Sequence, residues 1–532
     1  MYRICLALVC LAGCARPPPA ADLTKERSPL PAIDEGEFVR ADGARFVIGE
    51  RPVRFVGVNA SLVHGGTTRA DTPRLLESMA GDGVRLARVW ALGETEGDEA
   101  WRRDVAFRLG PDAWVEESFV HLDRVLAEAR ANDVRVILVL ANRWGDRGGL
   151  PQLARWAGIT PRRRHLLPSE LRAVLESEAA RALYLAHVER LVARRNTVTG
   201  VPYRDDPTIF AWELINELSS STCAAQRAQL DWVRTMSARV RALDPNHLIA
   251  AGHIGYNSEQ SLAFWKQIHR LPEIGYADTH GYPQNLVDAV DPDALGDWLD
   301  HRAASADALG LPLLVGEVGV PRGDDGPFAP RAAWFETFLD RASRDGTDGV
   351  LLWIYRPWQE HEDSHGIWPW GPLAEETAPV RRLLQARAKP WDRVEANGAP
   401  DSDWALGVER VVPFVEGDWE GETLEVDPWA LAEGCAESDS AWLLYALPWQ
   451  ARAGRLDVAI PGETHGALRV LLDGRVVGTW RQGRFTQSHP PPLGTVTWMR
   501  LEALDADGAA LLRRFTTALP GATRLALTLH TP

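Results

Sequence analysis

The sequence has few basic residues, few cysteines and no long apolar run. Its 532 residues contain 58 lysines and arginines against 73 aspartates and glutamates, which gives a net charge of −15. Such a chain lacks the basic surface with which proteins neutralise a phosphate backbone, so nucleic acid is excluded as a partner. After the N-terminal segment there is no run of about 18 apolar residues, so we expect no membrane-spanning helix in the mature chain.

The N-terminal segment has the features of an export signal. One basic residue precedes the apolar stretch Ile4–Gly13, which has the length of a signal-peptide core and is too short to span a bilayer. Leu11-Ala12-Gly13-Cys14 resembles the bacterial lipoprotein box, which implies cleavage and lipid attachment at Cys14. An ordinary secretory signal with an incidental cysteine is the alternative. With Ala15 next, we expect the outer membrane if the cell has two membranes.

The sequence predicts no metal or organic cofactor. Of the five cysteines, only Cys223 and Cys435 remain after cleavage at Cys14. Export permits a disulfide between these two, and two buried unpaired thiols are equally compatible with the sequence. No cysteine and histidine cluster has metal-ligand spacing, so a structural zinc site is not expected. The oligomeric state stays open.

The chain divides into two folded parts. Short apolar strands alternate with amphipathic stretches such as 117–132, 168–194 and 331–345, a pattern that predicts an α/β (β/α)8 TIM barrel. An open doubly wound sheet would need a glycine-rich turn after its first strand, and none is present. We predict a signal peptide at 1–14, a proline-rich tether at 15–38 and the barrel at 39–392. The eight predicted strands are 54–59, 84–90, 134–140, 208–215, 248–251, 274–278, 313–316 and 349–353.

The apolar period changes to two after about residue 400. Alternating runs at 455–460, 467–480, 494–501 and 523–529, punctuated by Asp-Gly turns, predict an all-β sandwich at 400–532. Tryptophan is abundant, with 22 tryptophans against 8 tyrosines and 13 phenylalanines. Indole rings are suited to stacking on sugars. Seven of the tryptophans fall in the sandwich, as sugar platforms or as structural core, and the sequence does not decide between these two.

Polar residues finish the barrel strands, where TIM barrels carry their chemistry. These residues include two carboxylates on different strands, as glycoside hydrolysis with retention requires, when the carboxyl groups lie about 5–5.5 Å apart. Glu213 also points inward, but it lies deeper in the barrel. The strand-end residues are Arg88, Trp90, Asn142, Trp144, Asn216, Glu217, His280, Tyr282, Glu317 and Trp353.

Two stretches, 140–156 and 195–217, resemble the endo-β-1,4-mannanases of glycoside hydrolase family 5. The resemblance covers roughly residues 40–390. It implies that Glu217 is the acid/base, with a raised pKa, and that Glu317 is the nucleophile, kept ionised by Arg88 and Tyr282. It further implies that the substrate is β-mannan or a related plant-type polysaccharide. The other strand-end residues are expected to bind substrate, with Asn216 donating to the 2-hydroxyl and Trp353 beneath the reacting sugar: Arg88, Trp90, Asn142, Trp144, Asn216, His280, Tyr282 and Trp353.

The sequence departs from the family directly after the acid/base. The usual Pro-Arg is replaced by Leu218-Ser219, which puts the distal leaving-group subsite in doubt and suggests a shorter product-side cleft or a trimming role. A β-1,4-glucanase or another β-glycan hydrolase on the same barrel is an alternative. A non-catalytic glycan-binding surface lipoprotein is a further one, although the intact site residues disfavour it.

Overall fold

We describe the fold from a computed structural model of the chain. Cys14, Cys435 and the predicted boundary between the two domains fall outside the residues it describes, so these features stay predictions. The described residues are 33–387, except 35, 62–64, 66–68, 98, 163–165, 221–222, 257–258, 286–290, 323–327, 345 and 358–363, together with 423–426, 442–451, 455–459, 465–472, 475–488, 494–504, 507 and 525–530.

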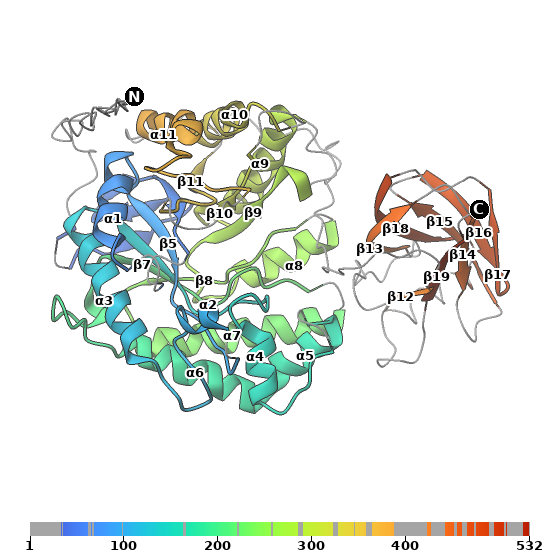
Figure 1. The fold of residues 1–532 in the computed structure, drawn as a ribbon, viewed down its shortest axis with the longest axis horizontal. Coiled ribbons are helices and arrows are strands. Elements are labelled where there is room, and N and C mark those ends of the chain that lie inside the picture. Colours follow the sequence, from blue (N-terminus) through green and yellow to red (C-terminus); the bar gives the residue numbers. More distant parts are fainter. Residues whose placement is uncertain are drawn as a thin grey trace, which may run out of the picture.

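Eight parallel strands form the centre of the first domain (Figure 1). Two backbone hydrogen bonds link each of the two outermost strands to residues that flank the other, from Gly275 N to Ile249 O at 2.9 Å and from His280 N to Ile254 O at 2.8 Å. The sheet therefore closes into a barrel, which confirms the predicted fold class. The order is β8 (Leu248–Ala250), β7 (Ile209–Glu213), β6 (Arg135–Val139), β5 (Leu86–Trp90), β4 (Phe55–Asn59), β11 (Thr347–Leu352), β10 (Leu313–Val318) and β9 (Ala277–Gly281).

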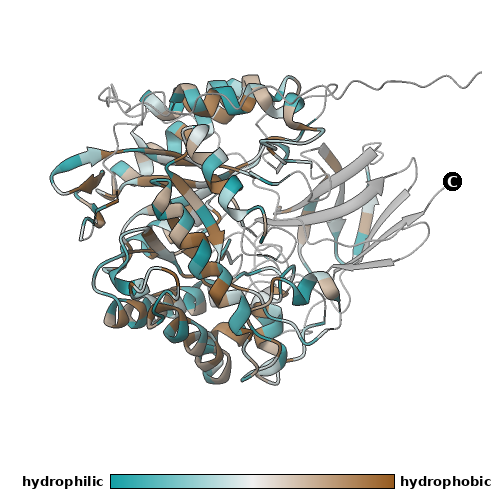
Figure 2. Cartoon of the chain, turned by 60° about the vertical axis from the view of Figure 1, so that its left-hand side comes forward, coloured by the Kyte–Doolittle hydropathy of each residue, from teal (hydrophilic) through white to brown (hydrophobic). Residues whose placement is uncertain are grey.

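Amphipathic helices surround the barrel and show both hydrophobic and hydrophilic faces (Figure 2). In α3, the buried Phe119, Leu122 and Leu126 recur at three and four residues, the spacing of one helix face. Among the described residues, none of the helices is long and apolar enough to cross a membrane. The helices are α1 (Thr72–Gly81), α2 (Ala100–Arg103), α3 (Glu116–Ala131), α4 (Gly149–Trp156), α5 (Pro168–Glu176), α6 (Glu178–Val192), η1 (Tyr203–Asp205), α7 (Cys223–Leu243), α8 (Glu259–His269), η2 (Pro283–Asn285), α9 (Pro292–Asp307), α10 (Arg331–Arg344) and α11 (Ala374–Arg387).

A small antiparallel sheet of β1 (Val39–Ala41), β2 (Phe46–Ile48) and β3 (Arg51–Val53) precedes the barrel. Phe46 is fully buried, and its ring packs edge-on at 5.1 Å from Phe210 and 5.5 Å from Tyr276. These aromatic rings belong to one apolar cluster with the first residues of several barrel strands. The cluster fills the amino-terminal end of the barrel and leaves the opposite end for the site.

Two elements differ from the sequence prediction. The single helix predicted at 168–194 is two helices, because Ser177 is extended (φ −72°, ψ 119°) and its hydroxyl accepts from Ala180 N at 3.3 Å. The strand predicted at 274–278 is β9, which starts at Ala277 and ends at Gly281. Apolar patterning missed its second half because the polar side chain of Asp278 is bonded inside the fold, to the backbone N–H groups of Gly252 and His253.

The C-terminal part contains two antiparallel sheets, as predicted. Trp480 is completely buried, which places this indole in the core of its sheet and not on a sugar-binding surface. One sheet has the order β12 (Thr423–Val426), β19 (Leu525–His530) and β14 (Arg455–Ala459); the other has β13 (Trp442–Ala451), β18 (Gly494–Ala503), β15 (Ala467–Leu472), β16 (Arg475–Arg481) and β17 (Arg484–Gln487).

Candidate active site

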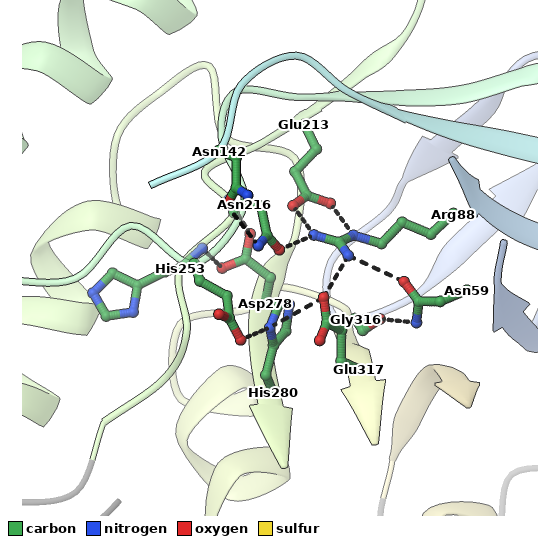
Figure 3. A network of polar contacts seen from close by, with 12 residues as sticks. Asn59, Arg88, Asn142, Glu213, Asn216, His253, Asp278, His280, Gly316 and Glu317 are labelled. Atoms are coloured by element: carbon green, nitrogen blue, oxygen red, sulfur yellow. Dashed lines mark hydrogen bonds and ion pairs between the residues drawn. The ribbon is translucent and has the colours of Figure 1, made fainter. Parts of the chain in front are cut away.

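Arg88, the central residue of β5, contacts residues near the ends of several other barrel strands (Figure 3). Its guanidinium donates two parallel hydrogen bonds to Glu213, at 2.6 and 2.7 Å, and one to Glu317 Oε1 at 2.7 Å. It also donates to Asn59 Oδ1 at 3.0 Å and to Asn216 Oδ1 at 2.7 Å. Arg88 is fully buried, and both carboxylates raise its pKa against the opposing effect of burial. One permanent cation therefore balances two buried acids.

The two glutamates of the predicted pair face each other across His280. His280 Nδ1 lies 2.9 Å from Glu217 Oε1 and 3.7 Å from Glu317 Oε1. One oxygen of each carboxylate and a ring nitrogen of His280 all lie within 4.8 Å of one another. Tyr282 donates a short hydrogen bond to the second oxygen of Glu317. Glu217 and Glu317 are thus close, differently hydrogen-bonded carboxylates.

Glycines on either side of Glu317 make room for the rings that contact the carboxylates. A Cβ at Gly316 would lie 2.9 Å from His280 Nε2, and a Cβ at Gly319 would lie 2.3 Å from Tyr282 Cε1. Glu217 itself has a φ of 56°, a conformation that non-glycine residues rarely adopt and that costs about 1 kcal/mol. This backbone conformation turns the Glu217 side chain toward the other acid.

Asn142 and Asn216 belong to a chain of hydrogen bonds that leads through Trp144 to Glu217. Asn216 Nδ2 donates to Asn142 Oδ1 at 3.0 Å, and the same oxygen accepts from Trp144 N at 3.2 Å. Trp144 Nε1 in turn donates to Glu217 Oε2 at 2.5 Å. The loop after β6 and the residues after β7 are therefore tied together at the acid.

Trp90 and Trp353 form the aromatic wall of the site. Their ring centroids are 6.1 Å apart at an interplanar angle of 42°, and Trp353 N donates to Val318 O, next to Glu317, at 2.9 Å. Trp90 is nearly buried, whereas Trp353 is partly exposed. Trp353 thus offers an accessible ring beside Glu317.

The ionisation of the pair differs from the sequence expectation. Burial favours protonated carboxyls, but donors from His280 and Trp144 outweigh it and lower the pKa of Glu217. Burial and the charge of Glu217 raise the pKa of Glu317. Burial opposes a charged His280, yet the two glutamates raise the pKa of His280. The expected raised pKa of Glu217 is therefore wrong, because hydrogen bonds from His280 and Trp144 favour its ionised form.

Glu217, His280 and Glu317 are also the kinds of side chain that bind metal ions. In this site, however, the carboxylate oxygens already accept hydrogen bonds. Arg88 and Tyr282 donate to Glu317, and Trp144 donates to Glu217. A cation would have to compete with the guanidinium of Arg88 for the same carboxylate. The donor set fits proton transfer and nucleophilic attack better than metal binding.

The structure brings all ten predicted strand-end residues into or beside one cluster. Arg88 and Asn142 have no exposed surface, so in this structure they hold other site residues and do not face a substrate. Glu213 is deep and paired with Arg88, as its position in the strand predicts. Sequence reasoning missed Asn59, although it ends the apolar run of β4 as the other site residues end theirs.

Comparison with known proteins identifies the fold family. Residues 36–369 match the model of the family described as GH family 5 beta-mannosidase-like. The chain belongs to this glycoside hydrolase family. The match covers the eight barrel strands and all the strand-end residues named above, and it ends before α11 and the C-terminal sheets. The barrel is accordingly the enzymatic part of a GH family 5 protein.

Individual relatives agree with the family match. The chain is 32% identical over 347 residues to rice "Mannan endo-1,4-beta-mannosidase 1", covering 60% of this chain and 78% of that protein. It is 30% identical over 387 residues to Arabidopsis thaliana "Mannan endo-1,4-beta-mannosidase 7", covering 67% and 86%. Among solved structures, the endo-1,4-beta-D-mannanase of Thermotoga petrophila RKU-1 has a TM-score of 0.54 and 27% identity, over 63% of this chain and 99% of that one.

Proposed function

We propose that this GH family 5 enzyme cleaves β-1,4-mannosidic bonds with retention, using Glu317 as nucleophile and Glu217 as acid/base. The observation that carries the proposal is the approach of the two carboxylates, with one oxygen of each inside 4.8 Å. Retaining glycosidases hold their carboxyl groups about 5–5.5 Å apart, whereas inverting enzymes need about 6.5–9.5 Å to admit a water molecule. The spacing supports direct attack by a carboxylate.

In the first step, Glu317 forms a bond to the anomeric carbon while Glu217 transfers a proton to the departing glycosidic oxygen. Arg88 and Tyr282 orient the attacking carboxylate through its two oxygens. In the second step, Glu217 takes a proton from water, and the resulting hydroxide displaces Glu317 from the sugar. Asn216, whose amide lies between Arg88 and Asn142, has a second N–H for the sugar 2-hydroxyl.

We infer that His280 holds the proton that Glu217 later donates. The pKa directions favour a charged His280 beside an ionised Glu217, over a hydrogen bond of 2.9 Å. Transfer along this bond yields the neutral acid that protonation of the leaving group needs, without a proton from solvent. Bound substrate excludes water and screens His280 from Glu317. Each of these effects makes a charged His280 beside an ionised Glu217 less favourable, and so favours the transfer.

The named roles are tested by chemical rescue with azide on an activated aryl β-mannoside. If Glu217 is the acid/base, E217A with azide yields the β-mannosyl azide, because azide opens the covalent intermediate from the face that water uses. If Glu317 is the nucleophile, E317A with azide yields the α-mannosyl azide by a single displacement. The reverse pattern of products would exchange the two roles, and no rescue of either variant would contradict double displacement.

Mannan as the substrate is supported by the relatives named above, and a β-1,4-glucan is the competing substrate on the same barrel. Hydrolysis of galactomannan, glucomannan and carboxymethylcellulose by wild type and E317A decides between them. Activity on carboxymethylcellulose alone would contradict the mannan proposal. Products from mannohexaose test the proposed shorter product side, since random internal cleavage would contradict a trimming role.

We also propose lipid anchoring at Cys14 in the cell envelope, on the strength of the N-terminal sequence alone. Metabolic labelling with a fatty-acid analogue should mark the wild-type chain and not C14S. Labelling of C14S to the same extent would contradict this assignment.

A further inference from the structure

Arg143, between Asn142 and Trp144, is a nearly buried cation without a counter-ion. Its side chain forms no ion pair within 4.0 Å among the described residues, and only 9% of its surface is exposed. Its side chain makes one hydrogen bond to the described residues, from Nε to Ser219 O at 3.2 Å. Burying an unpaired charge costs several kcal/mol, so a fold that keeps one here needs another reason for it.

The guanidinium of Arg143 is fixed in position. Its central carbon lies over the Trp144 ring, 4.3 Å from the ring centroid, in a cation–π contact. The contact with Trp144 uses one face of the guanidinium, and the hydrogen bond to Ser219 uses its Nε. The two terminal nitrogens donate to no group in the described part of the chain and are not enclosed by it. Four N–H bonds are therefore oriented and available.

Arg143 lies on one particular side of the acid. Glu217 Oε1 faces His280 and, beyond it, Glu317, whereas Glu217 Oε2 faces Trp144. Trp144 carries Arg143 on its ring, and Arg143 reaches Ser219, two residues after Glu217. The order across the site is thus Glu317, His280, Glu217, Trp144 and Arg143, with the Trp90–Trp353 wall at the Glu317 end.

If the enzyme acts as proposed above, the order from Glu317 to Arg143 gives the direction in which a bound saccharide runs, from the reacting sugar to the leaving-group sugar. The anomeric carbon must lie at Glu317 and the glycosidic oxygen at Glu217. The sugar that departs continues past Glu217, away from Glu317. We propose that Arg143 is a substrate-binding residue that donates hydrogen bonds to hydroxyl or ring oxygens of the leaving-group sugar, with Trp144 as its stacking support.

No nearby negative charge accounts for a buried cation at position 143 among the described residues. Burial lowers the pKa of Arg143 to about 10, and Glu217 is the acid that opposes this effect. Arg143 stays charged at neutral pH, and it acts on Glu217 only at long range, since no ion pair joins them. Sugar hydroxyls are suitable partners for such a cation because they accept without bringing a second buried charge.

The test compares two substrates with the same sugars on the Glu317 side. Mannotetraose cleaved at its centre releases mannobiose, whereas 2,4-dinitrophenyl β-mannobioside releases a phenol. We expect R143M to lower the ratio of kcat/KM for mannotetraose to that for the aryl glycoside at least tenfold, with R143K intermediate. A ratio within twofold of the wild-type value would overturn the proposal.

Arg135 provides a matched control, because it begins β6, whereas Arg143 follows the other end of this strand. It is also buried, and burial lowers its pKa to about 10 as well. R135M should leave the substrate ratio unchanged, and an equal fall in R135M would show that loss of a buried cation alone causes the effect. A second readout is the partition of the glycosyl-enzyme between water and added mannobiose, which should shift toward water in R143M.

Failure of the proposed function gives a different result. If wild type hydrolyses neither mannoside but cleaves cellotetraose, the substrate assignment is wrong, and the same comparison is made with cellotetraose and 2,4-dinitrophenyl β-cellobioside. If wild type cleaves both mannosides and R143M changes neither the ratio nor the partition, the role of Arg143 alone is wrong.

Discussion

Trp144 Nε1 and Glu217 Oε2 are joined by a 2.5 Å hydrogen bond between the loop after β6 and the residue that follows β7 by four positions. This bond favours the ionised carboxylate and contributes to the lowered pKa of Glu217. W144F removes the donor and keeps an aromatic ring. Because the charged form loses a partner, the pKa of Glu217 should rise, and the limb of the kcat/KM profile that reports Glu217 should move to higher pH.

We expect kcat of W144F to fall about tenfold as well, since the carboxyl loses an orienting contact. The control is W156F, because Trp156 Nε1 donates to no described residue. If the limb that reports Glu217 stays at the wild-type pH in W144F, the effect of this bond on Glu217 is contradicted. The measurement is a pH series of initial rates with an aryl glycoside.

Much of this arrangement follows from the sequence, and the reason is geometric. Parallel strands in a closed barrel end at one face, so the polar residue after each apolar run must approach the others. This geometry predicts that Glu217, Glu317 and His280 lie close together. It does not predict which donor reaches which carboxylate, and the assigned pKa of Glu217 was wrong for that reason. Ionisation depends on individual hydrogen bonds, such as that of His280, which strand periodicity does not encode.

Loop geometry was equally inaccessible from the sequence, as Glu94 shows. This acid follows β5, and its Oε2 accepts from Gly149 N at 2.9 Å, while its backbone N donates to Arg147 O at 2.9 Å. A Cβ at Gly149 would lie 2.2 Å from Asn142 O. Glu94 thereby closes the loop that presents Trp144. Nothing in the local sequence pattern distinguishes it from the exposed acids around it.

Glu94 supports a prediction about pH and stability. Burial raises the pKa of Glu94 to about 7, partly opposed by the Gly149 bond and by Arg108. Since this pKa lies above that of the unfolded chain, the contribution of Glu94 to stability is fully present below about pH 4.5 and is lost as pH rises through about 7. The loss amounts to at most about 3 kcal/mol.

E94Q should therefore flatten the pH dependence of the free energy of unfolding between pH 5 and pH 8. This is the range in which Glu94, with a pKa of about 7, loses its proton in the folded protein. The amide oxygen still accepts from Gly149, so E94Q should keep most of the activity, whereas E94A should lose it together with loop order. Urea unfolding at several pH values measures the first effect. A slope in E94Q equal to that of wild type would show that Glu94 does not titrate in this range.

Arg88 supports a prediction about charge balance. R88M leaves Glu213 and Glu317 buried without their cation, which should destabilise the fold by about 3–5 kcal/mol. R88M/E213Q removes one of the two acids and should regain a large part of that loss. Activity should stay low in the double variant, because Glu317 still lacks its donor at 2.7 Å. A double variant as unstable as R88M would contradict the balance of charges, as measured by chemical denaturation.

Gly319 supports a prediction about room for Tyr282. In G319A the added methyl group would lie 2.3 Å from Tyr282 Cε1, so the ring must move and its hydroxyl must leave Glu317. We expect kcat to fall about as far as in Y282F, and G319A/Y282F to be no worse than Y282F alone, because both changes remove one hydrogen bond. G97A is the control, since its added methyl group would meet side-chain atoms at an ordinary 3.4 Å. Additive losses in G319A and Y282F would show that Gly319 acts on something other than the bond from Tyr282 to the nucleophile.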